Sequence, residues 1–160
     1  MKVLFLDIDG VLNSERFREE EPGQAVDRRA VGLLKRVIDA TGAKLVLSSG
    51  WRFWFDDAMT PCEECARHLC AILAEQGLVL SGKTPDFSTA EIRAERTFSR
   101  VKAKEISAWL GAHPEAGQYA VLDDLELKDD EVNAHLIRVD GRIGLSEADA
   151  KRVVKRLNGS

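Results

Sequence analysis

"FLDIDGVLN", residues 5–13, closes a short apolar run with two aspartates and a glycine, and this stretch decides the fold. The run itself, Lys2 to Leu6, is typical of a strand buried on both faces of a parallel sheet. One polar residue is enough to lead a strand out of the core, yet Asp7 and Asp9 bracket a single isoleucine. The pair therefore indicates a site at the end of the first strand.

Strand and helix signals alternate through the rest of the chain, with short apolar runs for strands and apolar residues at helical spacing for helices. Ser146 is expected to cap the last helix, and residues 81–85 are expected to form a loop. The alternation predicts a three-layer α/β/α sandwich around a mainly parallel, Rossmann-like sheet. Further strands are expected at 44–47, 78–80, 119–122 and 135–139, and helices at 26–38, 102–110 and 146–157.

Composition limits the classes of function. A chain of 160 residues is the size of one domain, and its net charge of −4 gives no overall attraction to nucleic acid. The apolar runs are too short to span a bilayer, and Asp7 interrupts the N-terminal run, so neither a membrane span nor a secretory signal is expected. We therefore expect a cytoplasmic protein without a membrane partner.

The stretch "PCEECARHLC", residues 61–70, holds all three cysteines. An odd number of closely spaced cysteines argues against a disulfide framework and fits a reducing compartment. Cys62, Cys65, His68 and Cys70 are four potential zinc ligands, but structural zinc sites usually join two well-separated ligand pairs. On a helix Cys70 would also point away from the others, so cysteines packed in a small helical insertion are favoured over a zinc site.

Polar residues follow three of the predicted strands, and the carboxyl ends of parallel strands meet at one edge of a sheet. Converging carboxylates repel one another unless a cation neutralises them, and an all-oxygen ligand set suits Mg²⁺. Such a site suits phosphoryl transfer, in which positioning and charge stabilisation supply most of the catalysis. The residues are Asp7 and Asp9, Ser48 and Ser49, and Asp123 and Asp124.

Each of these residues has a chemically suitable role. Asp7 is a candidate nucleophile that would form an aspartyl-phosphate, and Asp9 would protonate the leaving oxygen and later activate water. The Ser48 hydroxyl and the Lys102 ammonium would hold the other phosphoryl oxygens. Ser49 and Arg52 are further candidates for binding the substrate phosphate. The alternatives are that Ser49 is a turn residue and that Arg52 is a solvated side chain.

These motifs resemble those of the haloacid dehalogenase (HAD) superfamily of phosphohydrolases. "LDIDGVLN" resembles the first motif, "LVLSSGWR" the second, Lys102 the third and "AVLDD" the fourth. Together with "KTP" at residues 83–85 and "KEISAWL", they resemble the small HAD domain that also occurs in bacterial multi-enzyme RNA-repair proteins. The aspartate at position 9 is the version associated with phosphatases rather than dehalogenases.

The resemblance implies a residue set for the site. Asp7 would be nucleophile and metal ligand, and Asp9 would be general acid/base and would offer its backbone carbonyl to the metal. Asp123 and Asp124 would complete the metal site, one of them directly, and Ser48 would bind phosphate. Gly10 fits the tight turn that members of the superfamily place after the nucleophile strand.

Two lysines are candidates for the third motif. Lys102 and Lys104 both lie at the start of one predicted helix. Lys102 is favoured because superfamily members often place an apolar residue four positions after this lysine, and Ile106 stands there. The alanine at 103 departs from the arginine-glycine pair of many relatives.

Residues 51–100 are expected to form a small helical, cap-like insertion within one domain of residues 1–160, too short for a large cap. Within this segment Arg93, Arg96 and Arg100 recur at helical spacing. If they share one helix, they form either a track for a polyanion or a solvated face paired with Glu91 and Glu95; the second is slightly favoured.

The sequence thus predicts a Mg²⁺-dependent phosphomonoester hydrolase acting through Asp7, with a nucleotide or a polynucleotide end as the suggested substrate. Two alternatives remain: a phosphotransferase or phosphate-accepting module with slow turnover, and a non-catalytic binding protein. The oligomeric state is left open.

Overall fold

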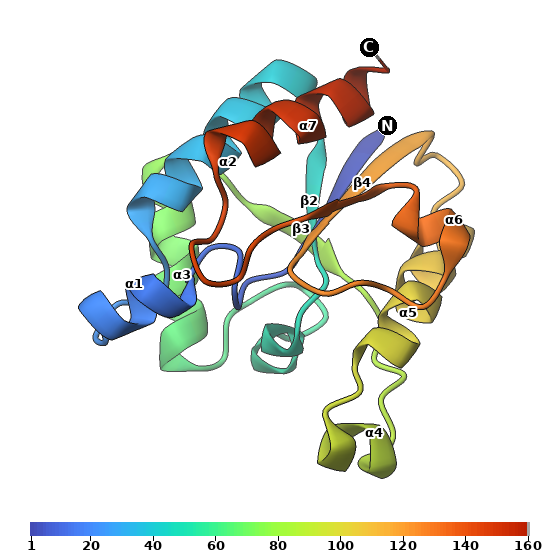
Figure 1. The fold of residues 1–160 in the computed structure, drawn as a ribbon, viewed down its shortest axis with the longest axis horizontal. Coiled ribbons are helices and arrows are strands. Elements are labelled where there is room, and N and C mark those ends of the chain that lie inside the picture. The colour runs from blue at the N-terminus through green and yellow to red at the C-terminus, as the bar shows by residue number, and fades with distance from the viewer. Residues whose placement is uncertain (160) are drawn as a thin grey trace.

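The computed structural model describes residues 1–159, and its five strands form one all-parallel sheet in the order β3-β2-β1-β4-β5 (Figure 1). The order reverses at β1, which pairs with β2 on one side and with β4 on the other. This makes the carboxyl end of β1 the switch point at which such sheets bind ligands. The strands are β1 (Lys2–Leu6), β2 (Lys44–Leu47), β3 (Leu80–Lys83), β4 (Gln118–Asp123) and β5 (Leu136–Arg138).

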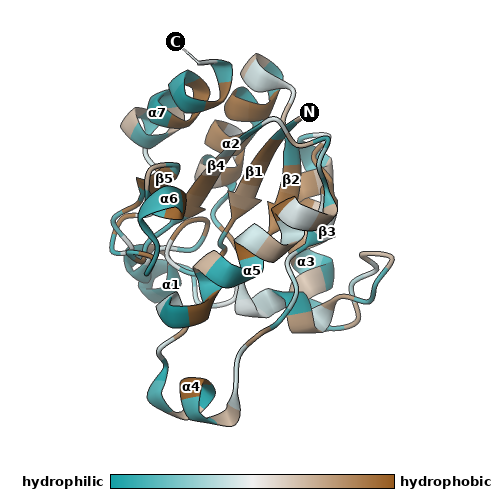
Figure 2. Cartoon of the chain, turned by 90° about the vertical axis from the view of Figure 1, so that its right-hand side faces the viewer, coloured by the Kyte–Doolittle hydropathy of each residue, from teal (hydrophilic) through white to brown (hydrophobic). Residues whose placement is uncertain are grey.

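Helices cover both faces of the sheet, which confirms the three-layer α/β/α prediction (Figures 1 and 2). One face carries α2, α3 and α7, and the other carries α5 and α6. Along β1 the side chains alternate: Leu4 and Leu6 pack into the first core, and Val3 and Phe5 into the second. The helices are α1 (Glu15–Glu20), α2 (Arg28–Thr41), α3 (Glu64–Glu75), α4 (Ala90–Glu95), α5 (Ser99–Ala112), α6 (Asp130–Asn133) and α7 (Glu147–Asn158), with a 3₁₀ helix η1 (Gly50–Trp54).

The element predictions are confirmed most closely where a strand is buried on both faces. The strands at 2–6 and 44–47 have the predicted bounds, and Ser146 caps α7 through a reciprocal hydrogen-bond pair with Asp149. The third strand lies later than predicted: β3 spans Leu80–Lys83, so most of the expected loop is strand. The small and polar residues of β3 do not form the apolar pattern by which a strand is predicted. The strand forms because it pairs in parallel with β2.

Arg93, Arg96 and Arg100 do not share one helix, so they form no single helical stripe. Arg96 adopts the left-handed conformation (φ 55°) and ends α4, and Arg100 lies on α5. The segment around α4 projects from the body of the protein below α5 (Figure 2). Within residues 1–159, no helix combines the length and the apolar character needed to cross a bilayer.

Candidate active site

The carboxyl ends of β1 and β4 bring three carboxylates together. Asp7 directly follows β1, and its backbone N–H donates to the carbonyl oxygen of Leu122 on β4 (3.0 Å). Asp123 is the last residue of β4, and Asp124 follows it. One carboxylate oxygen from each of Asp7, Asp123 and Asp124 lies within 4.8 Å of the others. Asp7 and Asp123, which are 116 positions apart in the chain, therefore meet in one cluster, because β1 and β4 are neighbours in the sheet.

Lys102 provides positive charge beside the cluster. Its Nζ, on the first turn of α5, lies 2.6 Å from Asp123 Oδ2 and 3.5 Å from Asp7 Oδ1. The side chain is buried, whereas Lys104 is exposed to solvent. Burial alone would lower the pKa of the Lys102 ammonium, but the charges of Asp7 and Asp123 raise it above its ordinary value. Lys102 is therefore charged at neutral pH.

One lysine does not balance three carboxylates. Burial, opposed by Lys102 and reinforced by the charges of Asp123 and Asp124, raises the pKa of Asp7 well above its ordinary value. Burial and the charge of Asp123 likewise raise the pKa of Asp124. The cluster thus holds more negative charge than its surroundings compensate, and all its donors are oxygens. These residues fit a hard divalent cation such as Mg²⁺.

Two glycines make room for the Asp124 carboxylate. A Cβ added at Gly10, which has φ +84°, would lie 2.4 Å from Asp124 Oδ2. A Cβ added at Gly141, in the loop after β5, would lie 2.8 Å from the same oxygen. Since real Cβ atoms do not approach so closely, any side chain at either position would displace Asp124. The backbone at Gly10, where a tight turn is expected, thus packs directly against the carboxylate cluster.

Asp9 lies outside the cluster formed by the carboxylate oxygens, and its side chain is held separately. The indole N–H of Trp51 donates to Asp9 Oδ1 (3.2 Å), and the Asn13 side-chain amide donates to the same oxygen (3.0 Å). Asn13 in turn accepts from the backbone N–H of Gly10 (3.1 Å). Asp9 is exposed, so its carboxylate reaches solvent while Trp51 and Asn13 fix its orientation.

The two serines after β2 are used differently. Ser48 is fully buried, its backbone N–H donates to the carbonyl of Leu6 (2.8 Å), and its hydroxyl has no hydrogen-bond partner among the described residues. A buried hydroxyl without a partner is uncommon, and a bound anion would provide one. Ser49 Oγ instead accepts from the N–H of Trp51 (3.2 Å) and caps η1.

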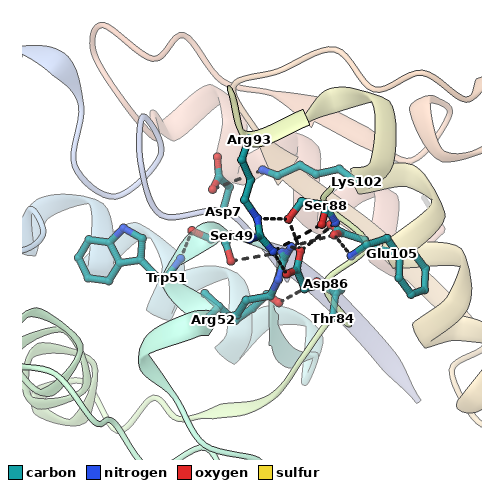
Figure 3. A network of polar contacts seen from close by, with 12 residues as sticks. Asp7, Ser49, Trp51, Arg52, Thr84, Asp86, Ser88, Arg93, Lys102 and Glu105 are labelled. Atoms are coloured by element: carbon teal, nitrogen blue, oxygen red, sulfur yellow. Dashed lines mark hydrogen bonds and ion pairs between the residues drawn. The ribbon is translucent and has the colours of Figure 1, made fainter. Parts of the chain in front are cut away.

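Arg52 is buried, so the alternative of a solvated arginine is wrong. Figure 3 shows the polar contacts of this residue. Its Nη2 donates to Glu105 Oε2 on α5 (2.8 Å) and to Asp86 Oδ1 (3.0 Å). Asp86 also accepts from Ser88 Oγ (2.6 Å) and from Arg93 (3.2 Å). Arg52 therefore ties η1 to α5 and to the segment that carries α4, and most of its hydrogen-bonding capacity is used within the protein.

Burial and hydrogen bonding in this network shift the pKa values of Glu105 and Asp86 in opposite directions. Burial raises the pKa of Glu105, although the Phe87 N–H and Arg52 oppose the shift. For Asp86, burial alone would raise the pKa, but hydrogen bonds from Ser88 and Arg52 lower it to about 2. Asp86 is therefore the fully ionised partner of the arginines.

A cavity of about 250 Å³ joins these parts. The candidate nucleophile, Lys102, Arg52 with Glu105 and several apolar side chains line it. Its volume is large enough for a phosphoryl group with part of its leaving group. Its lining is Asp7, Asp9, Ser49, Gly50, Arg52, Phe53, Phe98, Lys102, Glu105, Asp124 and Leu125.

The cysteines lie apart from this cavity. Cys62 and Cys65 are exposed, Cys70 is half-buried, and Cys62 precedes α3 rather than sharing it with His68. Within residues 1–159, Asp7, Asp123 and Asp124 are the one group of three or more metal-ligating side chains brought close enough to hold an ion.

Several residues of the site carried no signal in the sequence. Glu105 sits in a charged helical stretch that is typical of a solvated face, and Asp86 sits in a polar loop. Gly141 is one glycine of a polar turn. Asn13 was part of the first motif but had no assigned role. A close look at Asn13, four residues after Asp9, could have suggested a local hydrogen bond; the other three depend on contacts distant in sequence.

Comparison with protein-family models matches the chain over residues 3–150 to a family described as "HAD domain in Swiss Army Knife RNA repair proteins". The matched region includes β2 to β5, all of β1 except Lys2, and every residue of the cavity. Comparisons with curated proteins and with solved structures gave no significant match.

Proposed function

Since the chain belongs to the family of HAD domains in Swiss Army Knife RNA repair proteins, we propose that it is a Mg²⁺-dependent phosphomonoester hydrolase acting through Asp7. The single observation that carries the proposal is the meeting of Asp7 with Asp123, Asp124 and Lys102 in a buried cluster. A structural role alone does not account for three carboxylates around one ammonium, because their burial costs stability.

Asp7 acts as the nucleophile. One oxygen of its carboxylate attacks the phosphorus, the bond from phosphorus to the leaving oxygen breaks, and the electron pair stays on that oxygen. Lys102 opposes the rise in the pKa of Asp7 and holds its carboxylate in place, and the Ser48 hydroxyl donates to a phosphoryl oxygen. Asp7, Asp123, Asp124 and the backbone carbonyl of Asp9 would hold Mg²⁺, which supplies positive charge against the phosphoryl oxygens when bound.

Asp9 transfers the protons. It protonates the leaving oxygen as the first bond breaks, and as a carboxylate it then takes a proton from the water that attacks the phosphorus of aspartyl-phosphate. The second step releases inorganic phosphate and restores Asp7. The hydrogen bonds from Trp51 and Asn13 leave one Asp9 oxygen available for these transfers. A general acid/base at this position favours hydrolysis over a phosphate-accepting module with slow turnover.

The substrate class that we propose is a phosphorylated nucleotide or nucleic-acid end. The description of the family and the absence of a large cap support this proposal. Within residues 51–100, α3 and β3 belong to the core and the sheet, which leaves η1 and the six-residue α4 as the additional helices. An open site admits a polymer end that a closed one would exclude.

A substrate panel assayed with and without Mg²⁺ tests the function. We expect Mg²⁺-dependent phosphate release from 3′- or 5′-phosphorylated oligonucleotides, no release by Asp7→Asn, and weaker release from free sugar phosphates. Preference for sugar phosphates would contradict the substrate class. A single burst without turnover would favour the phosphate-accepting module, and inactivity on every substrate would favour a binding protein.

A further inference from the structure

The cavity that holds Asp7 also gathers exposed apolar side chains. Three of them line it: Phe53 on η1 is 57 % exposed, Phe98 at the start of α5 is 38 % exposed, and Leu125 after β4 is 37 % exposed. Within residues 1–159, the large apolar side chains with such exposure are Met1, Phe53, Val79, Phe87, Phe98, Leu125 and Ile143. Nearly half of that set thus surrounds one small cavity, and clustering of this kind marks a binding surface.

We propose that Phe53 and Phe98 form a stacking site for the nucleobase next to the phosphate that Asp7 removes. The proposal rests on the proposed function and adds to it the residues that recognise the leaving group. Because Phe53 and Phe98 line one cavity with Asp7 and Lys102, one ligand can contact both aromatic residues while its phosphoryl group lies at the nucleophile. A planar ring is the chemical group that stacks on exposed aromatic side chains without needing a particular sequence.

Phe53 is held in place before a ligand binds. The guanidinium carbon of Arg52 lies 5.5 Å from the centre of the Phe53 ring, and that of Arg93 lies 5.8 Å from it. Both arginines are themselves fixed by Asp86, and Arg52 also by the buried Glu105. An aromatic ring that is positioned in advance loses little conformational entropy on binding, so its stacking contributes to affinity.

Positive charge around the mouth fits an anionic partner. Arg93, Arg96 and Arg100 are exposed; Arg93 lies on α4, Arg96 ends it, and Arg100 lies on the first turn of α5. Arg93 pairs with Asp86 and Arg100 contacts Glu95 at 4.0 Å, whereas Arg96 forms no ion pair with residues 1–159. This charge favours a nucleotide or an oligonucleotide over an apolar peptide as the occupant.

The test compares substrates that differ only in the base. Two oligonucleotides of one sequence carry the same terminal phosphate, and one of them has an abasic terminal residue. A nucleoside monophosphate and the matching ribose phosphate form a second pair, which distinguishes free nucleotides from polymer ends. Variants Phe53→Ala and Phe98→Ala are compared with Phe87→Ala, because Phe87 is a similarly exposed aromatic side chain (44 %) outside the cavity.

We expect Phe53→Ala and Phe98→Ala to lower kcat/KM on the base-bearing member by about fivefold to a hundredfold, mainly through KM. The abasic member should change less than about twofold, and Phe87→Ala should behave as the wild type on both. Equal losses on the two members, or no loss on either, would overturn the proposal. If the wild type hydrolyses no phosphomonoester, the proposed function fails instead. Binding of the same oligonucleotides, followed by fluorescence anisotropy, then decides the stacking: weaker binding of the base-bearing member by Phe53→Ala supports it, and unchanged binding contradicts it.

Discussion

The ammonium of Lys102 lies 2.6 Å from the Asp123 carboxylate, which fastens the first turn of α5 to the end of β4. The same ammonium lies 3.5 Å from Asp7, so one side chain neutralises part of the charge of both acids. Its position in the fold therefore serves both the proposed chemistry and the stability of the cluster.

Replacing Lys102 and Lys104 separately tests which lysine belongs to the site. Lys102→Ala leaves buried carboxylates without their cation, so we expect phosphatase activity to fall by at least about a hundredfold. Lys104→Ala removes an exposed charge, and its activity should stay within about twofold of the wild type. A fully active Lys102→Ala, measured on protein that circular dichroism shows to be folded, would contradict the assignment.

The buried pair of Arg52 and Glu105 predicts a non-additive effect on stability. Arg52→Met leaves the Glu105 carboxylate buried without its partner, so we expect the free energy of unfolding to fall by about 3 kcal/mol. The double variant Arg52→Met with Glu105→Leu removes both charges and should regain most of that loss. Urea unfolding measures all three proteins. A double variant less stable than Arg52→Met would show that the pair is not coupled as described.

Asp86 predicts a pH dependence of stability. Its folded-state pKa of about 2 lies below the usual value for an unfolded aspartate, so its ionised form stabilises the folded protein at neutral pH. That contribution is fully present above about pH 4 and disappears as the pH falls toward about 2. Asp86→Asn should therefore be less stable than the wild type at pH 7, with a difference that shrinks across this interval. A difference that stays constant with pH would contradict the shift.

Gly141 predicts an effect on metal binding through Asp124. Its φ is not positive, and the atom that an added Cβ would meet is the end of a flexible side chain, so Gly141→Ala should fold with little loss of stability. The displaced Asp124 carboxylate should raise the Mg²⁺ concentration for half-maximal activity by roughly tenfold. Gly117→Ala is the matched control, because an added Cβ there meets nothing within 4 Å.

A second readout for Gly141→Ala does not need activity. Binding of Mg²⁺ to the folded state raises the melting temperature, and the rise should require more Mg²⁺ in this variant than in the wild type or in Gly117→Ala. Identical titrations of all three proteins would show that Asp124 does not take part in metal binding.

The fold was predictable because its main strands are buried on both faces. The apolar runs at 2–6 and 44–47 have only one plausible role, and the polar residues that follow them must then meet at one sheet edge. The same reasoning predicts from the sequence alone that Asp123 lies close to Asp7, as the structure shows. Strand burial and strand order thus determine the centre of the site.

The surroundings of the site were not predictable in the same way. Arg93, Arg96 and Arg100 have helical spacing, but the left-handed conformation of Arg96 ends the helix between them. Glu105 belongs to a charged stretch whose burial depends on Arg52, fifty-three positions earlier. Such pairings depend on tertiary contacts that no local pattern encodes.

A phosphoryl group on Asp7 is the most direct test of the proposed chemistry. Wild-type protein mixed with a labelled phosphomonoester and Mg²⁺ is quenched in acid within a single turnover, digested, and the labelled peptide identified by mass spectrometry. The label should be on the peptide that contains Asp7, be released by hydroxylamine, and be absent from Asp7→Asn. Rapid turnover by the wild type with no labelled protein at any quench time, or with activity kept in Asp7→Asn, would contradict nucleophilic catalysis by Asp7.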